Sequence, residues 1–247
     1  RLKGLKDLGI DLSAKEILSL KPKERPPQLN MARSLGYIIV DPPYTDKEKD
    51  KLLGNVSLDL ELGDTLRIHG NPHTHPVERD GSLEDPIVDI TISETIELVE
   101  KNDTLFKLKK GQCYVLAPGA LVKAFTLRYF FMPYNLMGMV SGRSKLGRFG
   151  ITTTVDAPKI DPGFSGRIVL ELAHLGRYRF ALRVGMQVSQ MMFFTVEGKI
   201  GKPYDEIHPG YERQDGIKYA IPPISLFPNR ITERRGIIPI NKQEEDS

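Results

Sequence analysis

The chain has 247 residues, which is enough for one large all-β domain or two smaller ones with a substantial core. Its 35 basic and 32 acidic side chains give a formal net charge of +3, so no global charge excess favours a nucleic-acid or polybasic membrane partner. A single cysteine, Cys113, excludes an intramolecular disulfide and any metal cage of several cysteines.

The sequence also has no apolar stretch near the roughly 18 residues that a membrane span requires. The charged start, Arg1-Leu-Lys-Gly4, lacks the apolar run of a signal peptide. We therefore expect a cytoplasmic protein that binds neither membrane nor nucleic acid.

The first predicted element is a short helix running towards Leu20. Ser13-Ala-Lys-Glu16 has the pattern of a capping box, in which the serine hydroxyl and the glutamate carboxylate satisfy the first free amides. Pro22, Pro26 and Pro27 are expected to end this helix, and the polar residues 41–50 to form a surface connection. Residues 1–55 are thus predicted to be a helix and a connection.

From residue 56 onwards, apolar and polar residues alternate in short runs bounded by Gly, Pro, Asn or Asp, which is typical of half-buried strands. This pattern predicts an all-β core over residues 56–200, built as a β-sandwich or distorted barrel. The proline-marked, charged residues 201–247 are expected to form a C-terminal arm or tail. The predicted strands lie at residues 56–62, 87–92, 95–99, 112–116, 121–125 and 180–184.

A basic turn follows the apolar run at residues 136–140. The segment Ser141-Gly-Arg-Ser-Lys-Leu-Gly-Arg148 combines flexible glycines, a hydroxyl and three cations. Glycine lets backbone amides approach an anion, and the planar fork of arginine matches phosphate oxygens. The same composition also occurs in ordinary solvated loops, so both interpretations stay open at this point.

Glu171 interrupts a strand that is otherwise apolar, Ile168-Val-Leu-Glu-Leu172. A buried carboxylate is unfavourable unless it is paired or protonated. One explanation is a structural ion pair with Arg148 or Arg167. The other is a general base whose pKa is tuned by burial.

Four ordered motifs resemble those of the dCTP deaminase family, in the dCTP deaminase and dUTPase superfamily. The early strand Val56-Ser-Leu-Asp-Leu-Glu-Leu-Gly63 also looks like a family motif. The resemblance implies a dUTPase-like fold, a homotrimer with shared sites and an enzyme acting on a pyrimidine deoxynucleoside triphosphate. The four motifs are Gly142-Arg-Ser-Lys-Leu-Gly-Arg148, Ile160-Asp-Pro-Gly-Phe-Ser-Gly166, Ile168-Val-Leu-Glu-Leu172 and Gly185-Met-Gln-Val-Ser-Gln190.

The resemblance further implies catalytic roles. Glu171 matches the general base that activates water, and Arg148 and Ser144 match residues that position that base and the pyrimidine ring. Ala157 matches a position whose backbone contacts the water or the exocyclic group of the ring.

The substrate-binding residues are implied in the same way. The phosphate contacts match Arg143 and Ser144, with Lys145 beside them. The sugar contacts match Asp161 and Phe164, whose ring would leave no room for a 2′-hydroxyl. In the arm, Pro203-Tyr204 and Tyr211-Glu-Arg-Gln214 resemble a closing segment, with Tyr204 and Gln214 as contacts.

Several positions depart from the family pattern. Thr154 stands where many deaminases have histidine, Asp156 where threonine is usual, Lys145 in place of a second serine, and Gly210 where a lysine often binds phosphate. Because Asp156 adds an acceptor near the ring, the preferred base stays open.

No zinc site is expected, because a zinc deaminase needs two cysteines besides a further His or Cys ligand. We interpret the histidines at 69, 73 and 75 as a polar loop, and His174 and His208 as surface or tail residues. Magnesium is expected only on the substrate triphosphate.

The first functional hypothesis is metal-free hydrolytic deamination of dCTP to dUTP. The alternatives are cleavage of dUTP to dUMP and pyrophosphate, alone or after deamination, and a non-catalytic deoxynucleotide sensor. Against a pure dUTPase, the chain shows no glycine-rich phosphate-closing motif at its end.

Overall fold

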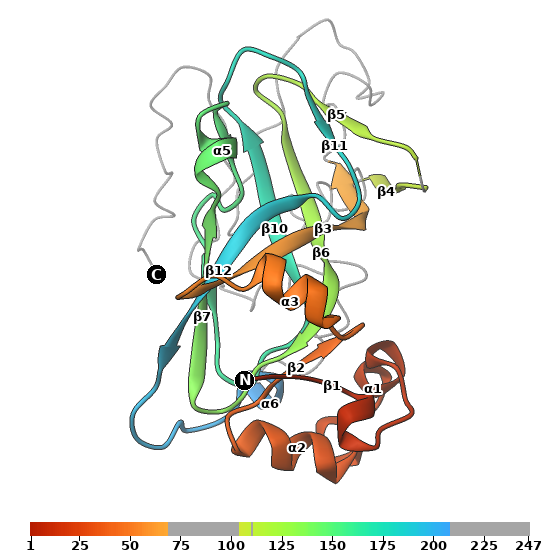
Figure 1. Cartoon of the computed structure of the whole chain (residues 1–247), viewed down its shortest axis with the longest axis vertical. Coiled ribbons are helices and arrows are strands. Elements are labelled where there is room, and N and C mark those ends of the chain that lie inside the picture. Colours follow the sequence, from red (N-terminus) through yellow and green to blue (C-terminus); the bar gives the residue numbers. More distant parts are fainter. Residues whose placement is uncertain (69–103, 110, 208–247) are drawn as a thin grey trace, which may run out of the picture. The chain divides into compact units, whose positions relative to one another are not determined.

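The computed structural model describes residues 1–68, 104–109 and 111–207 (Figure 1). All of these residues belong to one of the two compact units of the chain, and that unit is described by itself. The strands expected at 87–92 and 95–99, and the arm past residue 207, lie outside the described residues. No helix in the described part of the chain is both long enough and apolar enough to cross a membrane.

Short helices and two strands occupy the first 55 residues. The helix expected after Ser13 is confirmed, because the Ser13 hydroxyl accepts from the Glu16 amide while the Glu16 carboxylate accepts from the Ser13 amide. The elements are β1 (Leu2–Gly4), the 3-10 helices η1 (Lys6–Leu8) and η2 (Pro22–Glu24), α1 (Ala14–Ser19), α2 (Pro27–Ser34), β2 (Ile38–Asp41) and α3 (Asp46–Leu52).

Two of these helices were not expected from the sequence. Pro27 does not end a helix but begins α2, at the first helical position, where its missing N–H is not needed. The polar segment 41–50 contains a second capping box, between Thr45 and Glu48, that starts α3. The expected surface connection therefore holds a helix.

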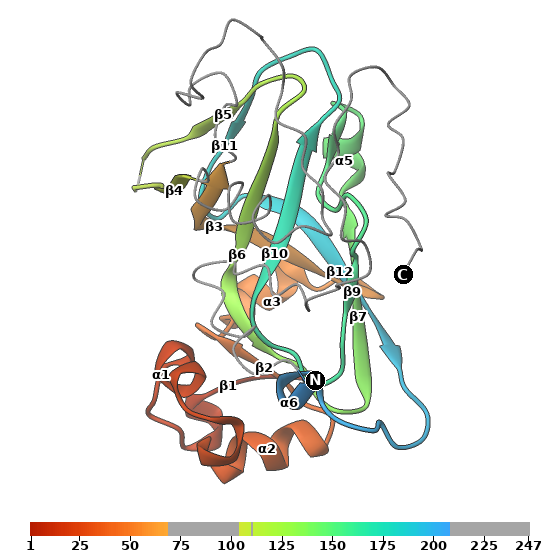
Figure 2. The same cartoon turned by 180° about the vertical axis from the view of Figure 1, so that it is seen from behind.

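Ten of the described strands form two layers that share β3 (Ser57–Ile68), which crosses from one to the other, while β5 and β11 pair as a separate two-stranded sheet (Figures 1 and 2). Its first half pairs with β12 and its second half with β6 and β4. The all-β fold class is confirmed as a sandwich; within the described residues the main strand order ends at β1 and β9 and does not close into a barrel. The later elements are β4 (Thr104–Lys107), β5 (Tyr114–Leu116), β6 (Leu121–Phe131), β7 (Leu136–Gly142), α5 (Ser144–Gly147), β8 (Ile151–Thr152), β9 (Lys159–Ile160), β10 (Ser165–His174), β11 (Phe180–Leu182), β12 (Gln187–Thr195) and α6 (Tyr204–Ile207).

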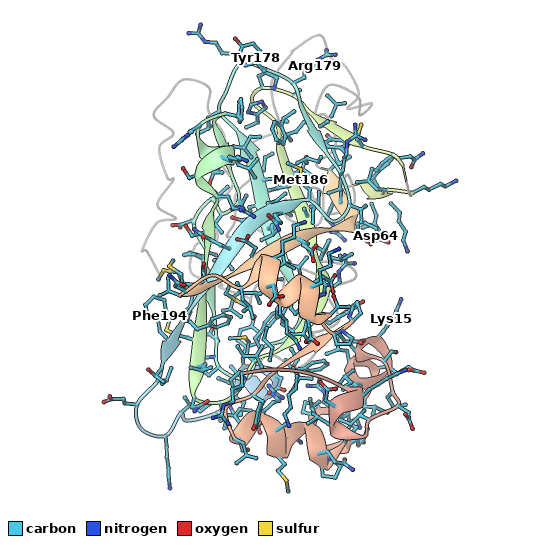
Figure 3. All side chains as sticks on the ribbon, in the orientation of Figure 1. Lys15, Asp64, Tyr178, Arg179, Met186 and Phe194 are labelled. Atoms are coloured by element: carbon cyan, nitrogen blue, oxygen red, sulfur yellow. The ribbon has the colours of Figure 1, made fainter. Side chains whose placement is uncertain are left out.

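The register shift in β3 includes a glycine, Gly63, that has no room for a side chain. The register between β3 and β6 shifts between Leu62 and Leu66, and a Cβ built on Gly63 would lie 1.8 Å from Nη2 of Arg167. Arg167 is buried there, where its Nε donates to the Thr126 carbonyl at 2.6 Å and its Nη1 lies 3.4 Å from Oδ1 of Asp64. Figure 3 labels Asp64 on β3. Any side chain at position 63 would displace this guanidinium.

Apolar side chains from the alternating strands form the main core, and a smaller core lies under α1 and α2. In β10 the alternation puts Leu170 and Leu172 at 0% exposure and leaves Glu171 half-buried on the other face. The sequence indicated a buried carboxylate at position 171, but Glu171 is only partly buried. A strand presents successive side chains to opposite faces, so Glu171 lies on the face away from Leu170 and Leu172. The predicted boundaries near residues 55 and 200 stay predictions, although β2 of the first segment pairs with β6.

His174, expected at the surface, is 1% exposed. Its Nδ1 accepts from the Gly176 amide at 3.1 Å, so its Nε2 donates to the Tyr178 carbonyl. Tyr178 lies on the connection that follows β10 (Figure 3). The histidine satisfies main-chain groups of that connection, which a single-residue inspection of the sequence does not reveal.

Candidate active site

A β-hairpin between β8 and β10 carries five of the eleven predicted site residues. Its arms pair at one end, where Thr152 of β8 opposes Ala173 of β10 and the Glu171 amide donates to the Thr153 carbonyl at 3.1 Å. The first arm then leaves β10 and joins β7 through β9, and the Val140 amide donates to the Pro158 carbonyl at 2.7 Å. The two arms therefore separate along residues 154–158 before the tight turn at 161–164 rejoins them.

Glu171 faces this separated stretch. Its Oε2 accepts a hydrogen bond from the Val155 amide at 3.0 Å. Neither arginine considered as a structural partner pairs with Glu171 within the described part of the chain: Arg167 pairs with Asp64, and Arg148 is exposed. A half-buried carboxylate held by a main-chain amide keeps lone pairs that can accept a proton from water.

Asp156 and Ala157 lie two and three residues past Thr154 on the first arm, and both are exposed. They therefore lie on the same hairpin as Glu171, on the opposite arm. Their roles towards the ring stay predictions.

The predicted phosphate turn forms α5, a single helical turn that follows β7. Leu146 is 4% exposed and anchors the turn, while Ser144, Lys145 and Arg148 are exposed. Three polar side chains of this turn are thus open to solvent.

Arg143, the residue that caps α5, is held by two other strands. Its Nη1 lies 2.7 Å from Oδ2 of Asp59 in β3, and the same atom donates to the Gln187 side chain in β12. Burial raises the pKa of the Asp59 carboxyl, and the Arg143 guanidinium opposes this shift. The pair fixes the direction of an arginine that still has other N–H groups to offer an anion.

A hydroxyl relay links the hairpin to this turn. Thr153 donates to the Ser189 hydroxyl at 3.2 Å, and Ser189 donates to the Ser141 carbonyl at 2.7 Å. Both hydroxyl-bearing residues are 0% exposed. The sequence analysis assigned no role to Thr153, Ser189, Asp59 or Gln187. Of these, Ser189 and Gln187 lie within the fourth motif.

Phe164 of the tight turn contacts Tyr204 of α6, a pair that the sequence did not predict. Their ring centroids are 5.8 Å apart, and the Tyr204 amide donates to the Pro162 carbonyl at 3.1 Å. Gly163 has φ +83°, and a Cβ there would lie 2.7 Å from Cβ of Pro203. Phe164 is 8% exposed in the chain, so little of its ring is accessible.

Asp161, in the same turn, lies 2.8 Å from Nζ of Lys159 through its Oδ1. Gln214 lies outside the described residues, together with Gly210 and the histidines at 69, 73 and 75.

Comparison with known proteins shows to which family the chain belongs. A family model described as dCTP deaminase-like matches residues 28–196. The chain belongs to the dCTP deaminase-like family. The dCTP deaminase of Tolumonas auensis is 34% identical over 183 residues, which cover 73% of this chain and 88% of that protein. The dCTP deaminase of Shewanella amazonensis is 31% identical over 179 residues, covering 72% and 86%.

Two solved structures align with low TM-scores. The 2′-deoxycytidine 5′-triphosphate deaminase of Agrobacterium tumefaciens gives a TM-score of 0.43 at 20% identity, over 63% of this chain and 43% of that chain. The EIAV dUTPase gives a TM-score of 0.32 at 21% identity, over 42% and 84%.

The dCTP deaminase-like match contains the hairpin and α5 but ends before Tyr204. The contact between Tyr204 and Phe164 therefore rests on the structure, not on the match.

Proposed function

We propose that the protein hydrolytically deaminates dCTP to dUTP, with Glu171 as the general base and without zinc. The observation that supports this most is the carboxylate of Glu171, half-buried on the hairpin of a chain in the dCTP deaminase-like family. The relatives that match over most of their length are dCTP deaminases. In nucleotide metabolism such an enzyme is a source of dUTP.

In the proposed reaction, Glu171 accepts a proton from water while the water oxygen adds to the ring carbon that bears the amino group. The adjacent ring nitrogen, whose double bond to that carbon has become a single bond, takes this proton from Glu171. The proton of the new hydroxyl then passes through Glu171 to the amino nitrogen. The carbon–nitrogen bond breaks, ammonia leaves, and a carbonyl forms in its place. Ser144, Arg148 and the backbone of Ala157 are proposed to orient the base, the water and the ring.

The remaining residues bind the substrate in this proposal. Asp156 lies beside the pyrimidine ring, and Asp161 and Phe164 contact the sugar. Gln214 belongs to the segment that closes over the nucleotide. The triphosphate is bound by Arg143, Ser144 and Lys145, by charge-assisted hydrogen bonds.

Magnesium enters as part of the substrate, on the phosphate oxygens. In residues 1–68, 104–109 and 111–207, no three His, Cys, Asp or Glu side chains gather as metal ligands.

We further propose a homotrimer with shared sites, which is consistent with the exposed side chains of α5.

The test is incubation of the purified protein with dCTP and with dUTP, followed by separation of the nucleotides and assay of ammonia and pyrophosphate. We expect dUTP and one equivalent of ammonia from dCTP. Pyrophosphate from dUTP would instead indicate a dUTPase or a bifunctional enzyme. Binding without any product would indicate a deoxynucleotide sensor and would refute the proposed reaction.

A further inference from the structure

A buried charged cluster joins the N-terminal helices to the segment that carries Tyr204. The side chains of Arg25 and Arg33 are 0% exposed, and that of Asp205 is 4% exposed. Oδ2 of Asp205 lies 2.9 Å from Nη1 of Arg25 and 3.0 Å from Nη1 of Arg33. Buried ions are weak contributors to net stability, because desolvation offsets their attraction, so such a cluster is better explained by a role in fixing one arrangement.

Arg33 extends the cluster to the tight turn. Its Nε donates to the Met132 carbonyl at 2.9 Å and its Nη2 to the Gly163 carbonyl at 2.7 Å, while Nη1 contacts Asp205. A planar guanidinium holds these three acceptors in one fixed geometry. The turn at 161–164 and α6 are thus positioned by one side chain of α2.

Asp205 in turn positions its neighbour. The Tyr204 amide donates to the Pro162 carbonyl, and the Tyr204 ring packs on Phe164. Both views show α6 beside α2 at one end of the sheet (Figures 1 and 2). A shift of Asp205 would therefore move the Tyr204 ring relative to Phe164.

We propose that Asp205, together with Arg25 and Arg33, positions the Phe164–Tyr204 pair and thereby sets the selectivity for deoxyribose over ribose. This inference rests on the proposed function, in which Phe164 lies against the sugar. It makes α2, which is not part of the hairpin that carries Glu171, a determinant of substrate choice. Asp205 and Arg25 both lie outside the family match at 28–196.

The first test is Asp205→Asn, which keeps the shape and removes the charge that holds both arginines. We expect the preference for dCTP over CTP, taken as the ratio of kcat/KM values, to fall about tenfold or more, because small displacements of positioning groups have effects of that order. Arg33→Lys keeps the charge but loses the fork. Arg33→Lys should also lower the preference for dCTP over CTP. This variant replaces Asp205→Asn as the test if the Asp205 variant does not fold.

The second test is coupling to the aromatic pair. Phe164→Ala alone should relax the sugar preference, and adding Asp205→Asn should then cause little further loss, because both changes act through one contact. Glu48→Gln is the matched control. It removes one partner of the buried Arg128 side chain, and should alter melting temperature without altering the dCTP to CTP ratio.

An unchanged ratio in both cluster variants, beside a relaxed ratio in Phe164→Ala, would overturn the inference. An unchanged ratio in Phe164→Ala would overturn the sugar assignment and the inference with it. If the wild-type protein converts neither nucleotide, the proposed function fails. In that case the ratio of the calorimetric affinities for dCTP and CTP, measured in the same variants, tests the inference in place of the kcat/KM ratio.

Discussion

At the scale of single residues, the carboxylate of Glu171 has a main-chain donor in Val155 and no need of a cation to be held in place. Replacement by Gln keeps an oxygen that can accept from the Val155 amide but cannot take a proton from water. We expect Glu171→Gln to lose at least about 100-fold in turnover, the lower range for general acid–base catalysis, while melting temperature and triphosphate affinity stay near wild type.

Glu197→Gln is a suitable control, because Glu197 is exposed and lies outside the hairpin. Turnover, melting temperature and affinity should be measured on one preparation of each variant. A Glu171 variant that is destabilised but active would leave the carboxylate a structural role and end the proposed mechanism.

Arg143 is predicted to bind phosphate although it is already paired with Asp59. Arg143→Gln should weaken dCTP binding about tenfold or more and reduce its dependence on salt, because a charge-assisted hydrogen bond contributes about 1.5–3 kcal/mol. Calorimetry with deoxycytidine separates this effect from loss of structure, since that ligand has no phosphate. Equal weakening for both ligands would count against a phosphate contact.

At the scale of elements, an ion pair between Glu48 of α3 and Arg128 of β6 connects the helix to the sheet. Glu48 Oε1 lies 2.5 Å from Nη2 of Arg128, whose guanidinium also packs on the Tyr44 ring with its carbon 4.1 Å from the ring centroid. The pKa of Glu48 is held below its ordinary value of 4.5, first by the hydrogen bonds from the amide and hydroxyl of Thr45 and then by Arg128.

Because this pKa is lower in the folded state, Glu48 stabilises the fold fully above about pH 4.5 and loses that contribution as pH falls through its folded value. Glu48→Gln should therefore lower the melting temperature at pH 7 and flatten its fall between about pH 5 and 3. Thermal melts across this range check the prediction. A variant with the same acid profile as wild type would show that other carboxylates determine it.

The elements also show what sequence patterns can predict. The capping box at Ser13 predicted α1 because its signal is local. The same signal at Thr45 was hidden by the polar, proline-marked context, and the proline at position 27 was interpreted as a stop although prolines also begin helices.

The candidate site divides in a similar way. Its motif residues gather on one hairpin and the adjoining turn because they are close along the chain. Asp205, by contrast, is 172 residues from Arg33, and no local pattern indicates which distant partner a buried charge will find. The relay from Thr153 to Ser189 was missed for the same reason.

At the scale of the whole molecule, the proposed homotrimer is open to direct measurement. Light scattering at micromolar concentration should report about three times the chain mass of 27.8 kDa. Large apolar side chains stay exposed near the hairpin, such as Phe149, Val155 and Leu175, and burying them between subunits would be favourable. A monomer at that concentration would contradict the trimer.

The shared strand β3 has a consequence for how the molecule opens. Leu60 pairs with Ser189 in one layer and Leu66 with Ala124 in the other, so neither layer can detach without breaking hydrogen bonds in the same strand. Amide protons in both halves of β3 should therefore exchange with deuterium only through complete unfolding, with equal free energies and equal denaturant dependence. If the half paired with β12 exchanged at a much lower free energy, the two layers would be separate cooperative units.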